Sequence, residues 1–195
     1  MNLTLAVLLV LTGFGSWWLW GRHLPLTDLP HSRIAGEQGR SPENALAIAD
    51  LEGAGENYAA IDTLAGLRAL NTLTDAELAV YQAAGTSRVR VAVSNYELGK
   101  ATITLARTRS ADKASRAARK LNQLQLGYGF QRAKSDLAGA SVLPPAEGGQ
   151  PGGRAHYAHE RILVRVAFRG PNASAAYQKF TTLLRRQLEV LPAHG

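Results

Sequence analysis

Residues 88–105, RVRVAVSNYELGKATITL, contain the pattern that decides the fold of this chain. Apolar or small residues recur there at every second position, at Val89, Val91, Val93, Ala101, Ile103 and Leu105. Alternate side chains of a strand lie on the same face, so each half of the stretch predicts a strand with one apolar face. The residues between the halves, 95–99, are typical of a turn. The stretch therefore predicts a β-hairpin.

A similar order of elements recurs further along the chain. Ser110 predicts the cap of a helix that ends at Gly127, and Asn172 predicts the cap of the last helix. Between them lie a short strand-like piece and a long alternating stretch at 157–169. Sliding the hairpin along the chain aligns Tyr96 with Tyr157, and the two caps then align within one residue. We therefore expect a duplicated strand-strand-helix unit.

Two such units predict an α+β domain over residues 87–195, with a mainly antiparallel four-stranded sheet and both helices on its valine-rich face. Residues 41–86 precede it as an acidic helical segment. Three helices are expected in that segment, over residues 41–51, 59–73 and 74–85. The third begins with a capping box, because Thr74 is followed three residues later by Glu77.

Charge is divided unevenly along the chain. Residues 1–86 hold 4 basic and 9 acidic side chains, a net charge of −5, whereas residues 87–195 hold 18 basic and 6 acidic side chains, a net charge of +12; the sum is +7. A region this basic favours an anionic partner, either outside the protein or in its own acidic segment.

The hairpin pattern suggests where such a partner binds. If the apolar strand positions face the helices, the alternate positions share the opposite face. The candidate anion-binding residues of that face are Arg88, Arg90, Lys100, Arg161 and Arg165, with Arg169 as a further candidate at the strand end. An anionic lipid or an envelope polymer would suit this face. The alternatives are a solvated surface or coverage by the acidic residues 43–77.

The N-terminal run Leu3–Trp20, LTLAVLLVLTGFGSWWLW, is 18 uncharged residues and is predicted to be a membrane anchor, because as a helix it would reach roughly 27 Å. Trp17, Trp18 and Trp20 with Arg22 are expected at the membrane interface. A cleaved signal peptide is the alternative, but no basic residue precedes the run and no good cleavage site ends it. The predicted organisation is an anchor at 1–21, a tether at 22–40, and the two segments described above.

The side of the membrane on which the domain lies is less clearly marked. Three arginines after the run favour the cytoplasm by the positive-inside rule. The extended tether and the absence of cysteine favour an extracytoplasmic domain, which is our expectation.

Motifs for catalysis are few. The absence of cysteine excludes disulfides, thiolate metal sites and a cysteine nucleophile. His156 and His159 do not have zincin spacing and would point to opposite faces of a strand, so no metal site, cofactor or catalytic residue is predicted. Nucleic acid is not an expected partner, because the stretch 127–130 matches only part of the RNA-recognition signature.

The expected function is therefore a single-pass membrane-anchored, non-catalytic binding, scaffolding or accessory protein of the cell envelope. Its expected partners are the membrane and other membrane-protein subunits. A module that binds anionic lipid or polyanion through the basic face is the first alternative. A membrane-tethered hydrolase that uses His156 or His159 is the second.

Overall fold

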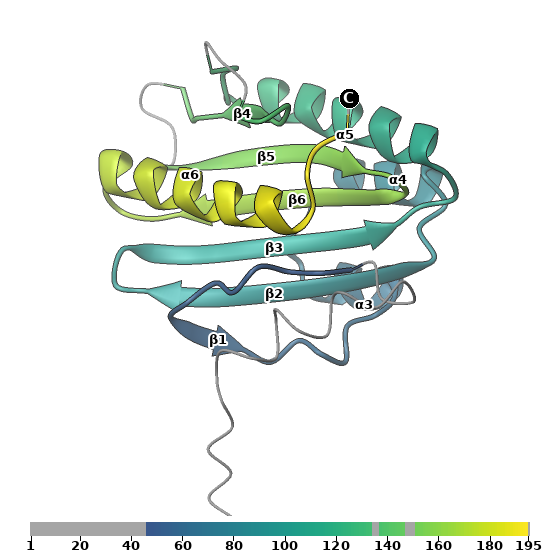
Figure 1. Ribbon diagram of the computed structural model, residues 1–195, viewed down its shortest axis with the longest axis horizontal. Coiled ribbons are helices and arrows are strands. Elements are labelled where there is room, and N and C mark those ends of the chain that lie inside the picture. Colours follow the sequence, from purple (N-terminus) through teal and green to yellow (C-terminus); the bar gives the residue numbers. More distant parts are fainter. Residues whose placement is uncertain (1–45, 134–136, 147–150, 195) are drawn as a thin grey trace, which may run out of the picture. The chain divides into compact units, whose positions relative to one another are not determined.

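The computed structural model describes residues 46–133, 137–146 and 151–194 (Figure 1). The predicted anchor at 1–21, with Trp17, Trp18, Trp20 and Arg22, and the predicted tether at 22–40 lie outside these residues. Within the described part, no helix has the length and apolarity needed to cross a membrane. That part is an α+β unit, as predicted.

The sheet has six antiparallel strands rather than the four that we predicted, in the spatial order β1-β2-β3-β6-β5-β4. The strands are β1 (Ala54–Glu56), β2 (Arg88–Tyr96), β3 (Gly99–Arg107), β4 (Ser141–Leu143), β5 (Gly152–His159) and β6 (Ile162–Arg169). The long strand expected at 157–169 is in fact a hairpin, because the chain turns at Glu160, which has a positive φ of 48°. The edge strands β1 and β4 have three residues each, too few to show a periodic pattern.

The described helices are α3 (Leu64–Ala69), α4 (Asp75–Ala83), α5 (Ala111–Gly127) and α6 (Ala173–Val190). The three predicted caps are confirmed. Thr74 and Glu77 form the capping box of α4, Ser110 caps α5, and Asn172 caps α6. The helix expected at 41–51 is wrong in its described part, because residues 46–51 contain no helix.

Helices α5 and α6 lie on opposite faces of the sheet, which corrects the expectation that they share one face. Helix α6 packs over the face that carries Ile103 and Val164. Helices α3, α4 and α5 cover the face that carries Val91 and Leu163. Figure 1 shows α6 in front of β5 and β6, with α3 and α4 behind the sheet. Both faces therefore carry a hydrophobic core.

The hairpin register explains this error. Val91 pairs with Thr104, and Ala92 pairs with Ile103. Directly paired residues point to the same face, so Val91 and Ile103 point to opposite faces. The order strand-strand-helix does recur, but α5 packs on β5 and β6 rather than on the hairpin that precedes it. The two units are therefore not equivalent in packing.

Residues 46–51 form a strap across the α6 face, lying in front of β2 in Figure 1. The side chain of Gln187 on α6 fixes the strap twice, because the Ala49 backbone N–H donates to its Oε1 at 2.9 Å and its Nε2 donates to the Ala47 carbonyl at 3.0 Å. At the far end of the strap, the Tyr96 hydroxyl donates to the Leu51 carbonyl. The strap thus completes the core on this side of the sheet.

Candidate anion-binding site

The five predicted anion-binding residues do not share one face. Lys100 and Arg165 lie on the face of α4 and α5. Arg165 pairs with Thr104, and Lys100 lies on the same side of β3 as Thr104 because the two are an even number of residues apart. Arg88 and Arg90 lie on the α6 face, since Arg90 pairs with Leu105. Arg161 lies in the turn between β5 and β6. The single basic face that we predicted is therefore wrong in its geometry, for the same reason of register.

Arg90 has a structural role in the strap. Its Nη1 donates a hydrogen bond of 2.8 Å to the carbonyl of Leu46. Burial lowers the pKa of Arg90 below its usual value, and the neighbouring charge of Arg88 lowers it further. Its guanidinium holds the first described residue of the strap.

Two adjoining cavities, of about 480 and about 290 Å³, lie on the α5 face at the end of the sheet where β3 begins and β6 ends. Their floor comes from β3, β5 and β6, and their walls come from the loop between α3 and α4 and from the residues after α5. Both cavities are lined by Asn71, Thr72, Phe130, Arg154 and Arg169. Because they share these residues, we treat them as one site, named here the arginine cavity.

Arg165 is the most unusual residue of the arginine cavity. It lines the smaller part, and only 3% of its surface is exposed. Among the described residues, no carboxylate lies within 4.0 Å of its guanidinium. Its buried Nε also has no hydrogen-bond partner in that part of the chain. Burying a cation without a counter-charge lowers the stability of the folded state, which makes the position of Arg165 unusual.

Arg154 contrasts with Arg165 because it has protein partners. It donates to Oε1 of Gln125, and its Nη1 lies 3.9 Å from Oε1 of Glu77. Its guanidinium also lies over the ring of Phe130, 4.6 Å from the centroid. Burial and the charge of Arg165 lower the pKa of Arg154 to about 10, although Glu77 opposes this change. The positive charge of Arg165 thus makes a second positive charge at Arg154 less favourable.

The remaining charges of the site do not neutralise it. Lys100 forms an ion pair of 2.6 Å with Glu56, whose pKa falls to about 2, first because of the hydrogen bond from Lys100. Glu77 is buried, and both of its carboxylate oxygens accept hydrogen bonds, from Gln125 and from the Thr74 backbone N–H. In the described part of the chain, the cavity is lined by four cations (Lys100, Arg154, Arg165 and Arg169) and one carboxylate (Glu77). With Glu56, the partner of Lys100, these groups have a net charge of +2.

A buried polar layer continues from Arg165 across the sheet. His156 pairs with Arg165 on the neighbouring strand, and its Nδ1 lies 2.9 Å from Oδ1 of Asn122. Burial lowers the pKa of His156 well below its usual value, and the charges of Arg165 and Arg154 lower it further. The histidine is therefore neutral near pH 7. Nε2 of His156, Oγ1 of Thr104 and the hydroxyl of Tyr81 are buried without a hydrogen-bond partner in the described residues.

His156 and His159 lie on opposite faces of β5, as predicted from their spacing. His159 hydrogen-bonds through Nδ1 to the Pro192 carbonyl at 2.8 Å and stacks near His194, with ring centroids 4.7 Å apart. In the described ranges, no group of three or more metal-ligating side chains comes together. The two histidines that motivated the hydrolase alternative therefore do not form one site.

Sequence reasoning missed Arg154 and the aromatic wall of the cavity. Arg154 lies two residues before His156 in the alternation of β5, so a correct start for this strand would have placed it on the same face as Arg165. Phe130 belongs to an irregular segment, for which no periodic signal exists.

Comparison with models of protein families, with curated proteins and with solved structures found no match for this chain. Function is therefore inferred from the geometry of the arginine cavity.

Proposed function

We propose that this chain is a membrane-anchored, non-catalytic binding protein whose arginine cavity binds a small anionic ligand. The observation that carries the proposal is Arg165, a buried cation that lines a cavity and has no carboxylate partner in the described residues. The anchor is residues 1–21, as expected from their uncharged run and terminal tryptophans.

Charge and geometry favour a carboxylate or a phosphate as the bound group. Guanidinium groups present N–H donors in a planar fork that matches these anions, and such charge-assisted hydrogen bonds are stronger than neutral ones. Arg154, Arg165 and Arg169 lie on β5 and β6, which are adjacent strands, so they converge on one region. An anion there would supply the counter-charge that Arg165 lacks.

The dimensions of the site favour a small molecule over a polymer. Its two parts, of about 480 and about 290 Å³, are of the size that usually holds small ligands. Phe130 and Tyr128 give the larger part an apolar wall, while Asn71, Thr72 and Thr74 offer hydrogen-bonding groups. We therefore infer a ligand that combines an anionic group with a less polar portion.

The side chains of the cavity support binding rather than catalysis. Glu77, the one carboxylate in the described lining, accepts hydrogen bonds from the Thr74 backbone N–H and from Gln125, so it is poorly placed to act as a general base. The threonines that line it, Thr72, Thr74 and Thr102, have no histidine within the lining to activate them. Among the described residues, the lining thus suits recognition.

Binding is best tested on the full chain in a nonionic detergent. Inorganic phosphate and citrate are titrated at constant ionic strength while the unfolding temperature and the heat of binding are measured. At 100 times its Kd, a ligand that binds only the folded state adds about 2.7 kcal/mol to the free energy of unfolding. We expect saturable binding of at least one probe.

Matched variants separate this site from general charge effects. Arg165→Met and Arg169→Gln should each abolish or strongly weaken binding. Arg88→Gln removes the same charge from the opposite face and should leave binding unchanged. The proposal is overturned if neither probe binds saturably, or if Arg165→Met binds as well as the original chain. Alkaline carbonate extraction tests the anchor separately, because an integral protein stays in the membrane fraction.

A further inference from the structure

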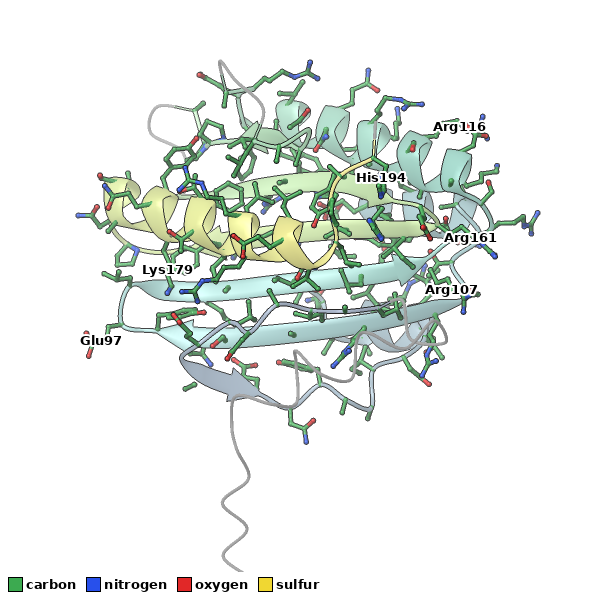
Figure 2. All side chains as sticks on the ribbon, in the orientation of Figure 1. Glu97, Arg107, Arg116, Arg161, Lys179 and His194 are labelled. Atoms are coloured by element: carbon green, nitrogen blue, oxygen red, sulfur yellow. The ribbon has the colours of Figure 1, made fainter. Side chains whose placement is uncertain are left out.

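A second cationic surface lies at the other end of the sheet from the arginine cavity. There β2 begins, β3 ends, the β5–β6 hairpin turns, and α5 starts. We define the basic end by six side chains, Arg88, Arg107, Arg109, Lys113, Arg116 and Arg161. Figure 2 shows Arg107, Arg116 and Arg161 together at this end and Glu97 at the opposite end. The Thr108 backbone N–H donates to the Arg161 carbonyl at 2.8 Å, which joins β3 to the turn.

The charges of the basic end are exposed and only partly balanced. Arg88, Arg109, Arg116 and Arg161 are exposed, and Arg107 and Lys113 are half-buried. Three carboxylates lie at this end, on Asp62, Asp112 and Glu160. Among residues 46–133, 137–146 and 151–194, six cations and three carboxylates leave this end a net charge of +3. Within the described residues, the only ion pair of this surface joins Arg116 and Asp112.

The first described residue of the strap lies near this surface. The strap enters the described domain at Leu46, whose carbonyl is bound by Arg90, two residues from Arg88. From there the strap runs towards Leu51 and Tyr96, which lie at the other end of β2. Only residues 22–45 separate Leu46 from the predicted anchor. The described strap thus begins near the basic end of the sheet.

We propose that the basic end docks on an anionic lipid surface, a contact that rests on the membrane anchoring proposed above. The surface potential of anionic lipids attracts basic side chains within about a Debye length, roughly 8 Å at physiological salt. Anchoring makes the contact intramolecular, so a weak attraction suffices. Because the arginine cavity lies at the opposite end of the sheet, docking would hold the cavity away from the lipid.

A lipid surface fits these residues better than a discrete ligand does. The six side chains come from two strands, a turn, a helix and the loop between β3 and α5, and neither described cavity includes any of them. Cations spread over several elements suit a surface of many weak charges. In contrast, the arginine cavity is concave, and its central arginine is buried.

The absence of cysteine from the chain makes the test straightforward, because single cysteines can be introduced for labelling. A fluorophore is attached at Ser87→Cys in the basic end, or at Glu97→Cys as the control, both of which are exposed. The full chain is reconstituted into phosphatidylcholine vesicles with or without phosphatidylglycerol, and quenching by a nitroxide on the lipid headgroup is measured. We expect quenching at position 87 only, only with phosphatidylglycerol, and its loss near 1 M salt, where the Debye length is about 3 Å.

Charge-matched variants identify the residues responsible. Arg88→Gln with Arg161→Gln should lower the ratio of docked to undocked domain about 25-fold, since each basic residue near an anionic surface contributes about a factor of five. Arg132→Gln with Arg185→Gln, which removes the same charge from exposed positions elsewhere, should leave the ratio unchanged.

The outcomes separate docking from anchoring. Equal quenching at positions 87 and 97, or equal effects of the two double variants, overturns the docking proposal. If carbonate extraction releases the chain, the anchor is wrong. Docking is then decided by co-sedimentation of the same chain with phosphatidylglycerol vesicles, which must depend on Arg88 and Arg161. Binding to a soluble polyanion but not to these vesicles also overturns it.

Discussion

Replacing Arg165 with methionine should stabilise the ligand-free protein while abolishing anion binding. Methionine keeps an unbranched stem of similar length but removes the charge and the N–H donors. In the native chain, 97% of the Arg165 surface is removed from solvent, since 3% is exposed, and no described carboxylate pairs with it. Its neighbours Thr104, Arg154 and His156 give no compensating negative charge.

The size of the effect follows from the contacts that Arg165 lacks. An unsatisfied buried donor such as its Nε costs about 1 to 3 kcal/mol. The effective penalty for a buried ion is several kcal/mol, but the guanidinium reaches the cavity, where solvent recovers part of this. We therefore expect the free energy of unfolding to rise by about 1 to 3 kcal/mol. For a chain of this size, the unfolding temperature should rise by roughly 2 to 4 °C for each kcal/mol.

Urea unfolding followed by far-ultraviolet circular dichroism measures the change, in a buffer without phosphate or polycarboxylates. Tryptophan fluorescence is unsuitable, because all three tryptophans lie at 17–20, outside the described domain. Arg90→Met is the matched control and should destabilise, because its guanidinium binds the Leu46 carbonyl. A loss of stability in Arg165→Met under these conditions would refute the reasoning, since it would show that the arginine is structural.

Three further predictions test the core, the strap and the buried histidine. Phe180→Ala should lower the free energy of unfolding by about 3 to 5 kcal/mol, because the ring is fully buried on the α6 face; an effect below 1 kcal/mol in urea unfolding would contradict this packing. Gln187→Ala removes both hydrogen bonds to the strap, so amide exchange should accelerate at Ala49 more than in β3. Burial, with the charges of Arg165 and Arg154, lowers the pKa of His156 well below 6.5, so the unfolded chain binds a proton that the folded chain does not. Stability should therefore fall as the pH drops below 6.5, by up to about 1.4 kcal/mol per unit, and His156→Gln should remove that part of the slope in unfolding titrations.

Local signals in the sequence predicted the elements that depend on neighbouring residues. The capping box of Thr74 and Glu77, the caps Ser110 and Asn172, and the hairpin at 88–105 all appear where expected. Each cap joins residues three positions apart, and the hairpin pairs two strands that are consecutive in the sequence, so the sequence pattern specifies them directly. The strap at 46–51 depends instead on Gln187, which is far away in the sequence. The short edge strands β1 and β4 depend on pairing with β2 and β5.

The error in the predicted anion-binding face comes from the register of the β2–β3 hairpin. Tyr96 pairs with Gly99 across a two-residue loop, so odd positions of β2 pair with even positions of β3. The apolar residues of both strands occupy odd positions, so those of β2 and those of β3 lie on opposite faces of the sheet. A loop one residue longer would have placed both runs on one face. The alternation alone does not specify the length of the loop, so it wrongly predicts that Arg90 and Arg165 lie on the same face of the sheet.

The two cationic regions should respond differently to salt, and this difference links them to different partners. Exposed charges at the basic end are screened over roughly 8 Å at physiological salt, so their attraction to a surface weakens steeply as salt rises. Arg165 is buried, so salt should screen its attraction for a bound anion much less than it screens the exposed charges. Salt that releases the basic end from lipid should therefore leave most of the binding in the arginine cavity intact. The domain would thus keep its ligand when the basic end leaves the lipid surface.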